Sequence, residues 1–326
     1  MAQTIDAPFK PAGIGADLVG TPAAEVRPVG GLGPIAPVAP IGRIAIDEAV
    51  RARRGPLVRS LIHAALFAGS LLVVFPFYWM VSTAFKTNTE ANSSPATLYP
   101  HEWHAENLAI VWRAAPFGQY FFNTVWVAFW WVGGVVLISA LAAYAFARMQ
   151  FAGKNVVFSI ILATMMIPAE VTTIPNFVLI TKWFGWYNTY QAQFVIHWGS
   201  VFAIFLLRQF FLTIPKELEE AAFIDGCSRF RFLWTILVPL SMPAMITVGL
   251  TNFLGAWNAF LWPLLVTRSP EMRPIQLGLV VFQSESGTRY AELMAATTLV
   301  IVPTVVVFLV AQKYFVEGIA RTGLKG

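Results

Sequence analysis

The side chains that could do chemistry are concentrated in one stretch, EEAAFIDGCSRFRFLWTILVP, at residues 219–239. It holds two adjacent glutamates, an aspartate and two arginines, and long apolar stretches lie on both sides. Acidic residues near a helix N-terminus complement its dipole, and Ala221 and Ala222 form helix without bulk, so another surface can approach closely. No set of nucleophile, base and orienting group is visible. We therefore expect contact with another surface here, and we expect no enzyme chemistry.

The flanks of this stretch predict how it folds. Pro215 suits a first helical position, where no backbone N–H is needed, and Asp225-Gly226 allows a turn. Asp225 or Ser228 can cap a second short helix, FRFLWTIL, which leads into Pro239. We expect a helix, a turn and a helix over residues 215–239, called here the charged segment. The alternative is an ordinary amphipathic loop that anchors on lipid headgroups through Arg229, Arg231 and Trp234.

Other kinds of site have little support. The nearest imitation of a phosphate-binding loop, Gly153-Lys154, lacks the upstream glycine because Arg148 occupies that position, so we expect no ATP binding by such a loop. His101 and His104 could touch a metal, but no third ligand accompanies them, and we expect no metal site. The single cysteine excludes an intramolecular disulfide. No basic patch indicates nucleic-acid binding.

The elements that hold the charged segment are membrane spans. The chain is 57% hydrophobic and 12% charged, far less charged than a soluble protein. Six apolar runs have room for the roughly 20 residues that a spanning helix needs, and only helices satisfy their own backbone in lipid. The runs are Arg59–Lys86, Arg113–Arg148, Lys154–Lys182, Lys182–Arg208, Arg231–Arg268 and Glu292–Lys313. The sequence predicts an all-α integral membrane protein with six transmembrane helices.

The distribution of basic residues predicts the orientation. Of the Lys and Arg from residue 51 onward, thirteen lie on the side of the termini and six on the other, and the excess marks the cytoplasm. Both termini and the charged segment are then cytoplasmic. Residues 1–55 are rich in Pro and Gly and are expected to be a disordered cytoplasmic tail, with a regulatory binding role left open. Residues 56–326 form the six-helix domain.

The charged segment resembles the EAA loop of ABC importer permeases. The shared pattern is Glu220-Ala221-Ala222, three residues, Gly226, nine residues, Ile236, one residue, then Val238-Pro239, with Val238 where the family has Leu. The stretches NFLGAWNAFLWPL and QKYFVEGIARTGLKG are similar to the carbohydrate-uptake, maltose-type subfamily, although Arg321 and Thr322 interrupt the second. The resemblance covers roughly residues 55–326.

This resemblance implies a type I ABC importer permease fold with cytoplasmic coupling helices in the bacterial inner membrane. Glu220 would face an arginine of the ATPase, Ala221 and Ala222 would allow close approach, and Gly226 would make the turn. The implied coupling residues are Glu220, Ala221, Ala222, Asp225, Gly226, Ile236 and Pro239. The implied partners are a second, homologous permease subunit, a dimer of ATPase subunits that bind ATP and Mg, and an extracytoplasmic sugar-binding protein. The chain itself would hold no cofactor.

Polar groups within spans are candidates for the substrate path, because burying them in lipid is costly. The candidates are Asn252, Trp257, Asn258, Trp262 and Glu170. Asn252 and Asn258 lie about 240° apart on an ideal helix. Either one lines the path while the other binds a neighbouring helix, or the helix bends near Gly255. The amides and indoles could equally be packing residues.

Glu170 lies between Pro168 and Pro175 in IPAEVTTIP. The resemblance places it in an external gate with a broken helix; a glutamate that snorkels at the outer interface is the alternative.

The function implied is import of a sugar, of di- or oligosaccharide size, by alternating access. The same fold could import a sugar phosphate, a sulfosugar or a polyol, although an anionic cargo would need Arg or Lys in the path and the spans contain none. An ion-coupled secondary transporter would rely on Glu170. A membrane scaffold or sensor without transport is the remaining alternative. A homodimer of permeases is possible, but the subfamily pairs two different ones.

Overall fold

The computed structural model describes residues 56–284 and 287–322. The tail expected over residues 1–55 lies outside the described residues. The chain divides within its first helix into two units, Met1–Gly69 and Ser70–Gly326. The second unit contains all the described elements except the first part of α2.

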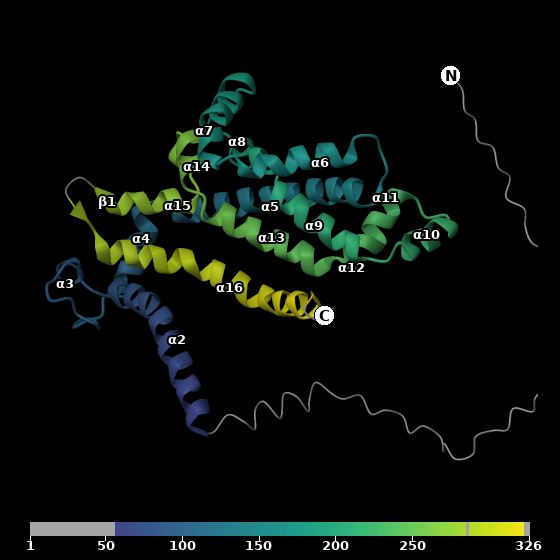
Figure 1. Cartoon of the computed structure of the whole chain (residues 1–326). Coiled ribbons are helices and arrows are strands. Elements are labelled where there is room, and N and C mark those ends of the chain that lie inside the picture. The colour runs from purple at the N-terminus through teal and green to yellow at the C-terminus, as the bar shows by residue number, and fades with distance from the viewer. Residues whose placement is uncertain (1–55, 285–286, 323–326) are drawn as a thin grey trace, which may run out of the picture. The chain divides into compact units, whose positions relative to one another are not determined.

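The regular elements of the described residues are helices apart from one short hairpin (Figure 1). The first half contains α2 (Pro56–Ala84), α3 (Asn88–Ala91), α4 (Glu106–Ala114), α5 (Phe117–Arg148), α6 (Lys154–Ala163), η1 (Thr164–Met166), α7 (Ala169–Val178), η2 (Leu179–Trp183), α8 (Tyr190–Phe194), η3 (Val195–His197) and α9 (Val201–Thr213). The second half contains α10 (Lys216–Ile224), α11 (Arg229–Phe232), η4 (Leu233–Leu237), α12 (Val238–Leu240), α13 (Met242–Trp257), α14 (Leu261–Val266), η5 (Pro270–Met272), α15 (Ile275–Gly278), η6 (Leu279–Phe282), β1 (Gln283–Ser284), β2 (Gly287–Thr288) and α16 (Tyr290–Thr322).

Three of the described helices are long and apolar enough to cross a membrane in one piece: α2 from Leu57, α5, and α16 as far as Val310. Three further spans are bent pairs. Their halves are Lys154–Met166 with Ala169–Trp183 at 101°, Tyr190–His197 with Val201–Thr213 at 46°, and Arg229–Leu240 with Met242–Trp257 at 82°. Counting each pair once gives up to six spans by length and composition, which matches the six apolar runs. A break was expected near Glu170, where the sharpest bend lies, and a bend near Gly255 was considered as an alternative.

The bends have local causes. At the sharpest one, Ile167 is extended (φ −82°, ψ 117°), as residues before proline prefer, and Pro168 is the N-cap residue just before α7. At the mildest one, Ser200 caps α9 by accepting a hydrogen bond from the Ala203 N–H at 3.3 Å. At the third, Ser241 separates two helices that each carry a proline near their start, Pro239 and Pro243.

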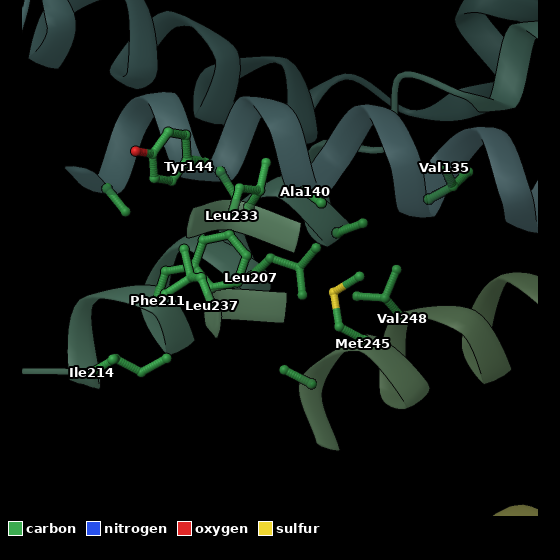
Figure 2. Close-up of a cluster of buried hydrophobic side chains, with 14 of the residues drawn as sticks. Val135, Ala140, Tyr144, Leu207, Phe211, Ile214, Leu233, Leu237, Met245 and Val248 are labelled. Carbon is green, nitrogen blue, oxygen red and sulfur yellow. The ribbon is translucent and has the colours of Figure 1, made fainter. Parts of the chain in front are cut away.

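The main core joins α5, α9 and α13, which lie side by side (Figure 1), to the charged segment. Figure 2 shows this cluster: Leu233 and Leu237 of η4 point among side chains of α5, α9 and α13. Both leucines are almost fully buried, as is Phe232 just before them. The second helix of the charged segment is therefore part of the core of the bundle.

A second set of contacts fastens the opposite end of α5. The Asn123 amide donates to the backbone oxygens of Glu271 at 2.7 Å and Arg273 at 2.9 Å, and its oxygen accepts from the Tyr190 hydroxyl at 2.7 Å. The neighbouring Thr124 hydroxyl accepts from the Ile275 N–H at 2.8 Å. Asn123 is fully buried. These bonds hold η5 and α15 against α5.

Candidate functional site

The charged segment folds as predicted, with one shift of a residue. Pro215 lies just before α10 instead of at its first helical position, because α10 begins at Lys216. After Asp225, Gly226 takes a left-handed conformation with φ 77°. The Cys227 N–H reaches the Ala222 oxygen at 2.9 Å, and the Gly226 N–H reaches the Phe223 oxygen at 3.0 Å. This pair of bonds is the Schellman ending, which favours glycine at that position.

The second helix begins with the cap that the sequence offered. Ser228 is extended, and its hydroxyl accepts from the Arg231 N–H at 3.3 Å. Of the two candidates for this cap, Asp225 instead ends α10. The predicted helix, turn and helix are therefore all present.

Arg148, counted in the sequence only as a basic residue near the membrane, fastens α10 from the inside. Its guanidinium lies 3.5 Å from the Glu219 carboxylate and donates to the backbone oxygens of Phe211 at 2.7 Å and Ile214 at 2.6 Å. The Tyr144 hydroxyl also donates to Glu219, at 3.4 Å. The Arg148 side chain is 3% exposed. One residue thus joins the end of α5, the end of α9 and the first charged helix.

The outer face of α10 is open. Glu220 and Ala221 are exposed, and Ile224, one turn after Glu220, is 86% exposed. Among the described residues Glu220 forms no ion pair, in contrast to its neighbour Glu219. Ala222 is buried in the chain's own core, so only Ala221 of the two alanines is available to another surface.

Ile236 and Pro239 lie elsewhere in the charged segment. Ile236 is partly buried against the main core, and Pro239 is exposed in α12, two residues before the bend at Ser241. Both therefore belong to the junction between the charged segment and α13.

Two of the path candidates are packing residues in the described structure. Trp257 is 2% exposed, and its indole N–H donates to the Val300 oxygen of α16 at 3.2 Å. Trp262 is 9% exposed and donates to the Ala192 oxygen of α8 at 2.8 Å. Each indole joins two segments of the bundle.

The two asparagines have different surroundings, as their angular separation predicts. The Asn252 oxygen accepts from the Trp131 indole of α5 at 3.4 Å. Asn258 follows the last residue of α13, where its amide donates to the Leu254 oxygen at 2.9 Å and its oxygen accepts from Gln276 at 3.3 Å. Asn252 therefore binds a neighbouring helix, and the exposed Asn258 lies where the helix ends; no bend near Gly255 is needed.

Trp131, the partner of Asn252, stacks on His197. Their rings are parallel within 7°, with centroids 3.3 Å apart, and the buried Nε2 of His197 has no hydrogen-bond partner among the described residues. This group brings α5, η3 and α13 together. Sequence reasoning missed both residues, because the pairing depends on how the fourth span bends.

Glu170 is exposed in the first turn of α7, directly after the 101° bend. The two histidines considered for a metal have carboxylate partners instead: His101 pairs with Glu90 at 2.6 Å, and His104 pairs with Glu106 at 2.5 Å. The described residues contain no group of three or more His, Cys, Asp or Glu side chains that could hold a metal ion.

Comparison with known proteins gives consistent matches. Residues 134–321 match the family model described as binding-protein-dependent transport system inner membrane component. A probable ABC transporter permease of Bacillus subtilis is 35% identical over 80% of this chain and 87% of its own length. The sn-glycerol-3-phosphate transport system permease of Yersinia enterocolitica is 36% identical over 79% and 94%. The arabinooligosaccharides transport system permease of Halalkalibacterium halodurans is 32% identical over 85% and 100%.

A solved structure shares the fold. It is a chain of a bacterial ABC transporter involved in the import of the acidic polysaccharide alginate, with a TM-score of 0.69 and 24% identity over 79% of this chain and 96% of that one.

Proposed function

Because the chain belongs to the family of binding-protein-dependent transport system inner membrane components, we propose that it is the permease subunit of an ATP-driven sugar importer. As a family member it is a transport component and not an enzyme. The substrate we propose is a di- or oligosaccharide, which crosses the membrane by alternating access. The observation that carries the proposal is the geometry of the charged segment, free on its outer face and fastened to three helices on its inner one.

That geometry suits a segment that transmits movement from a partner protein to the membrane spans. We propose that Glu220 accepts a charge-assisted hydrogen bond from a basic side chain of the ATPase and that Ile224 fills an apolar depression beside it. A displacement of α10 would pass to α5 and α9 through Arg148, and a displacement of η4 would pass through Leu233 and Leu237 into the core. The outer contact would therefore move the spans.

The proposed partners follow from this arrangement. ATP and Mg would be bound by a dimer of separate ATPase subunits on the cytoplasmic side, where the charged segment would lie if the excess of basic residues marks the cytoplasm. A second, homologous permease would complete the path, and an extracytoplasmic sugar-binding protein would deliver the cargo. The sugar-binding protein has a parallel in a solved structure of similar fold. That structure is a bacterial alginate ABC transporter in complex with a periplasmic protein bound to an alginate pentasaccharide.

The substrate class rests on local chemistry and on the relatives. The exposed Asn258 and its partner Gln276 offer amide groups without fixed positive charge, which suit the hydroxyls of a sugar. The arabinooligosaccharide relative supports a neutral oligosaccharide. The glycerol-3-phosphate relative supports a second candidate, a sugar or polyol phosphate, for which the partner permease would have to supply the cation.

The test is sugar-stimulated ATP hydrolysis by the complex reconstituted in vesicles with its partner subunits and binding protein. Glu220→Ala should assemble and bind sugar but lose about tenfold or more of the stimulated hydrolysis, because a charge-assisted contact contributes roughly 1.5–3 kcal/mol. The matched control is Glu217→Ala, an exposed glutamate one turn earlier on the same helix, which should retain stimulation.

Hydrolysis and uptake at wild-type rates in Glu220→Ala would show that the charged segment is an ordinary surface loop. A panel of neutral oligosaccharides and glycerol phosphates in the same assay separates the two substrate candidates. Uptake that needs a proton or sodium gradient and is abolished by Glu170→Gln would identify an ion-coupled carrier instead.

A further inference from the structure

A basic cavity of about 530 Å³ lies at the Arg148 end of α5, between the turn that leads into α6 and the side of α9. Its charged lining residues are Lys154 and Arg208, and its polar neutral ones are Gln150 and Asn155. No carboxylate of the described residues lines it. The cavity is therefore suited to an anion.

Both cations are held in place while most of their donors stay free. The Lys154 ammonium donates to the Met149 oxygen at 2.8 Å. Arg208 uses its Nε to donate to the Phe146 oxygen at 3.1 Å, and its guanidinium lies over the Phe158 ring at 4.2 Å. A lysine has three donors and an arginine five, so each side chain can also bind an anion.

Two further features add positive potential. Lys216 of α10 is near enough to act electrostatically on Lys154. The cavity also borders Gly153, whose left-handed backbone (φ 77°) precedes the first turn of α6, and the N-terminus of a helix carries partial positive charge. An anion in the cavity would be attracted both by Lys216 and by the N-terminus of α6.

The flank of the cavity is apolar and follows the span. Val156, which lines the cavity, is 64% exposed, and Ile160, one turn further along α6, is 61% exposed. Leu212 on the α9 side is 45% exposed. A ligand with an anionic head and an apolar tail matches this surface better than a free anion does.

We propose that this cavity binds the phosphate group of an anionic phospholipid, with an acyl chain along Val156 and Ile160. The lipid would lie beside the α5–α6 turn, close to Arg148 and to the charged segment, and would make their positions sensitive to membrane composition. This proposal depends on membrane insertion and does not depend on which solute is transported.

Native mass spectrometry of the purified transporter complex tests it, with phosphatidylglycerol and phosphatidylcholine titrated separately. The wild type should retain phosphatidylglycerol preferentially. Lys154→Gln should raise the half-saturating concentration about fivefold, as expected for one basic residue at a membrane surface. Lys182→Gln, which removes an exposed lysine from the other half of the same bent span, should leave it unchanged.

Two more variants distinguish a specific loss of lipid binding from a folding defect. Lys154→Arg should preserve lipid binding, and Asn155→Asp, which adds a negative charge while leaving Lys154 in place, should weaken it. Equal retention of the two lipids by the wild type, or equal phosphatidylglycerol binding by Lys154→Gln, overturns the proposal. Displacement of the lipid by equimolar inorganic phosphate also overturns it, because the site would then take a free anion.

Discussion

Arg148 is the residue on which the attachment of the charged segment most depends, since it contacts a carboxylate of α10 and two backbone oxygens at the end of α9. Arg148→Ala should lower the free energy of unfolding by about 3 kcal/mol, because Glu219 and both oxygens lose a buried partner. Thermal unfolding of the purified complex measures this.

The matched variant is Arg148→Lys. It keeps the charge but lacks the fork that reaches three acceptors, so its loss should be intermediate. A melting temperature of Arg148→Ala equal to that of the wild type would mean that the ion pair is dispensable.

The exposed pair of His104 and Glu106 predicts a pH dependence at the start of α4. The hydrogen bond to Glu106 raises the pKa of His104 above its usual 6.5, and the same bond lowers the pKa of Glu106 below 4.5. The histidine's contribution is complete below its unfolded pKa and is lost as pH rises through the raised value. The glutamate's contribution is present above its unfolded pKa and is lost as pH falls through the lowered one.

Protection of α4 amides from hydrogen exchange, corrected for intrinsic rates, should therefore be highest between these two values and should fall towards pH 8. In His104→Gln the fall towards pH 8 should disappear. The same fall in the variant would locate the titrating group elsewhere.

At the scale of single residues, the sequence predicted the features that depend on neighbours along the chain. The turn at Gly226 and the cap at Ser228 follow from local hydrogen bonding, and both are confirmed. The roles of Arg148, Trp257 and Trp262 could not be predicted, because their partners lie tens of residues away along the chain.

Among the elements, the turn of the charged segment depends on backbone conformation alone. A Cβ added at Gly226 would meet nothing within 4 Å, yet the residue has φ 77°. Gly226→Ala should therefore destabilise the turn by about 1 kcal/mol through strain only. The control is Gly199→Ala, which also meets open space but lies outside the left-handed region.

Hydrogen exchange at the Cys227 amide, which the turn protects, reports the effect locally. Exchange in Gly226→Ala as slow as in the control would show that the left-handed conformation is not required.

Two adjacent glycines of α5 test the packing of the fourth span. A Cβ at Gly134 would fall 1.9–2.2 Å from the indole of Trp198, which is itself held by a 2.9 Å hydrogen bond to the Trp130 oxygen. A Cβ at Gly133 would meet nothing within 4 Å. Gly134→Ala should cost about 1–3 kcal/mol by overpacking, whereas Gly133→Ala should be neutral or favourable by up to about 1 kcal/mol.

Thermal unfolding of the two variants in parallel compares them. Equal melting temperatures would contradict the close approach of α5 and Trp198. The sequence predicted the spans themselves, because apolar length suffices for that. It did not predict the bends at Ser200 and Ser241, since a serine between apolar runs has several possible structures.

At the scale of the whole molecule, the six spans were predictable from composition and the family from one short pattern in the charged segment. The arrangement of the spans was not, because it depends on buried contacts such as those of Leu233 and Leu237 with three other helices. The path candidates divide in the same way. Asn252 and Asn258 were correctly separated by helix geometry, but only the fold revealed Trp131 beside Asn252 and His197 stacked on Trp131.

The bonds of Asn123 also have a consequence for the order of events during synthesis. Its amide donates to backbone oxygens 148 and 150 residues later in the chain. At about 5–20 residues per second, a ribosome needs roughly 7–30 s to reach them after completing Asn123. Throughout that interval α5 carries amide donors without their final acceptors. A nascent chain halted before Glu271 should therefore keep this end of α5 accessible to water or to the insertion machinery. The loss of that accessibility marks the moment when the bundle closes.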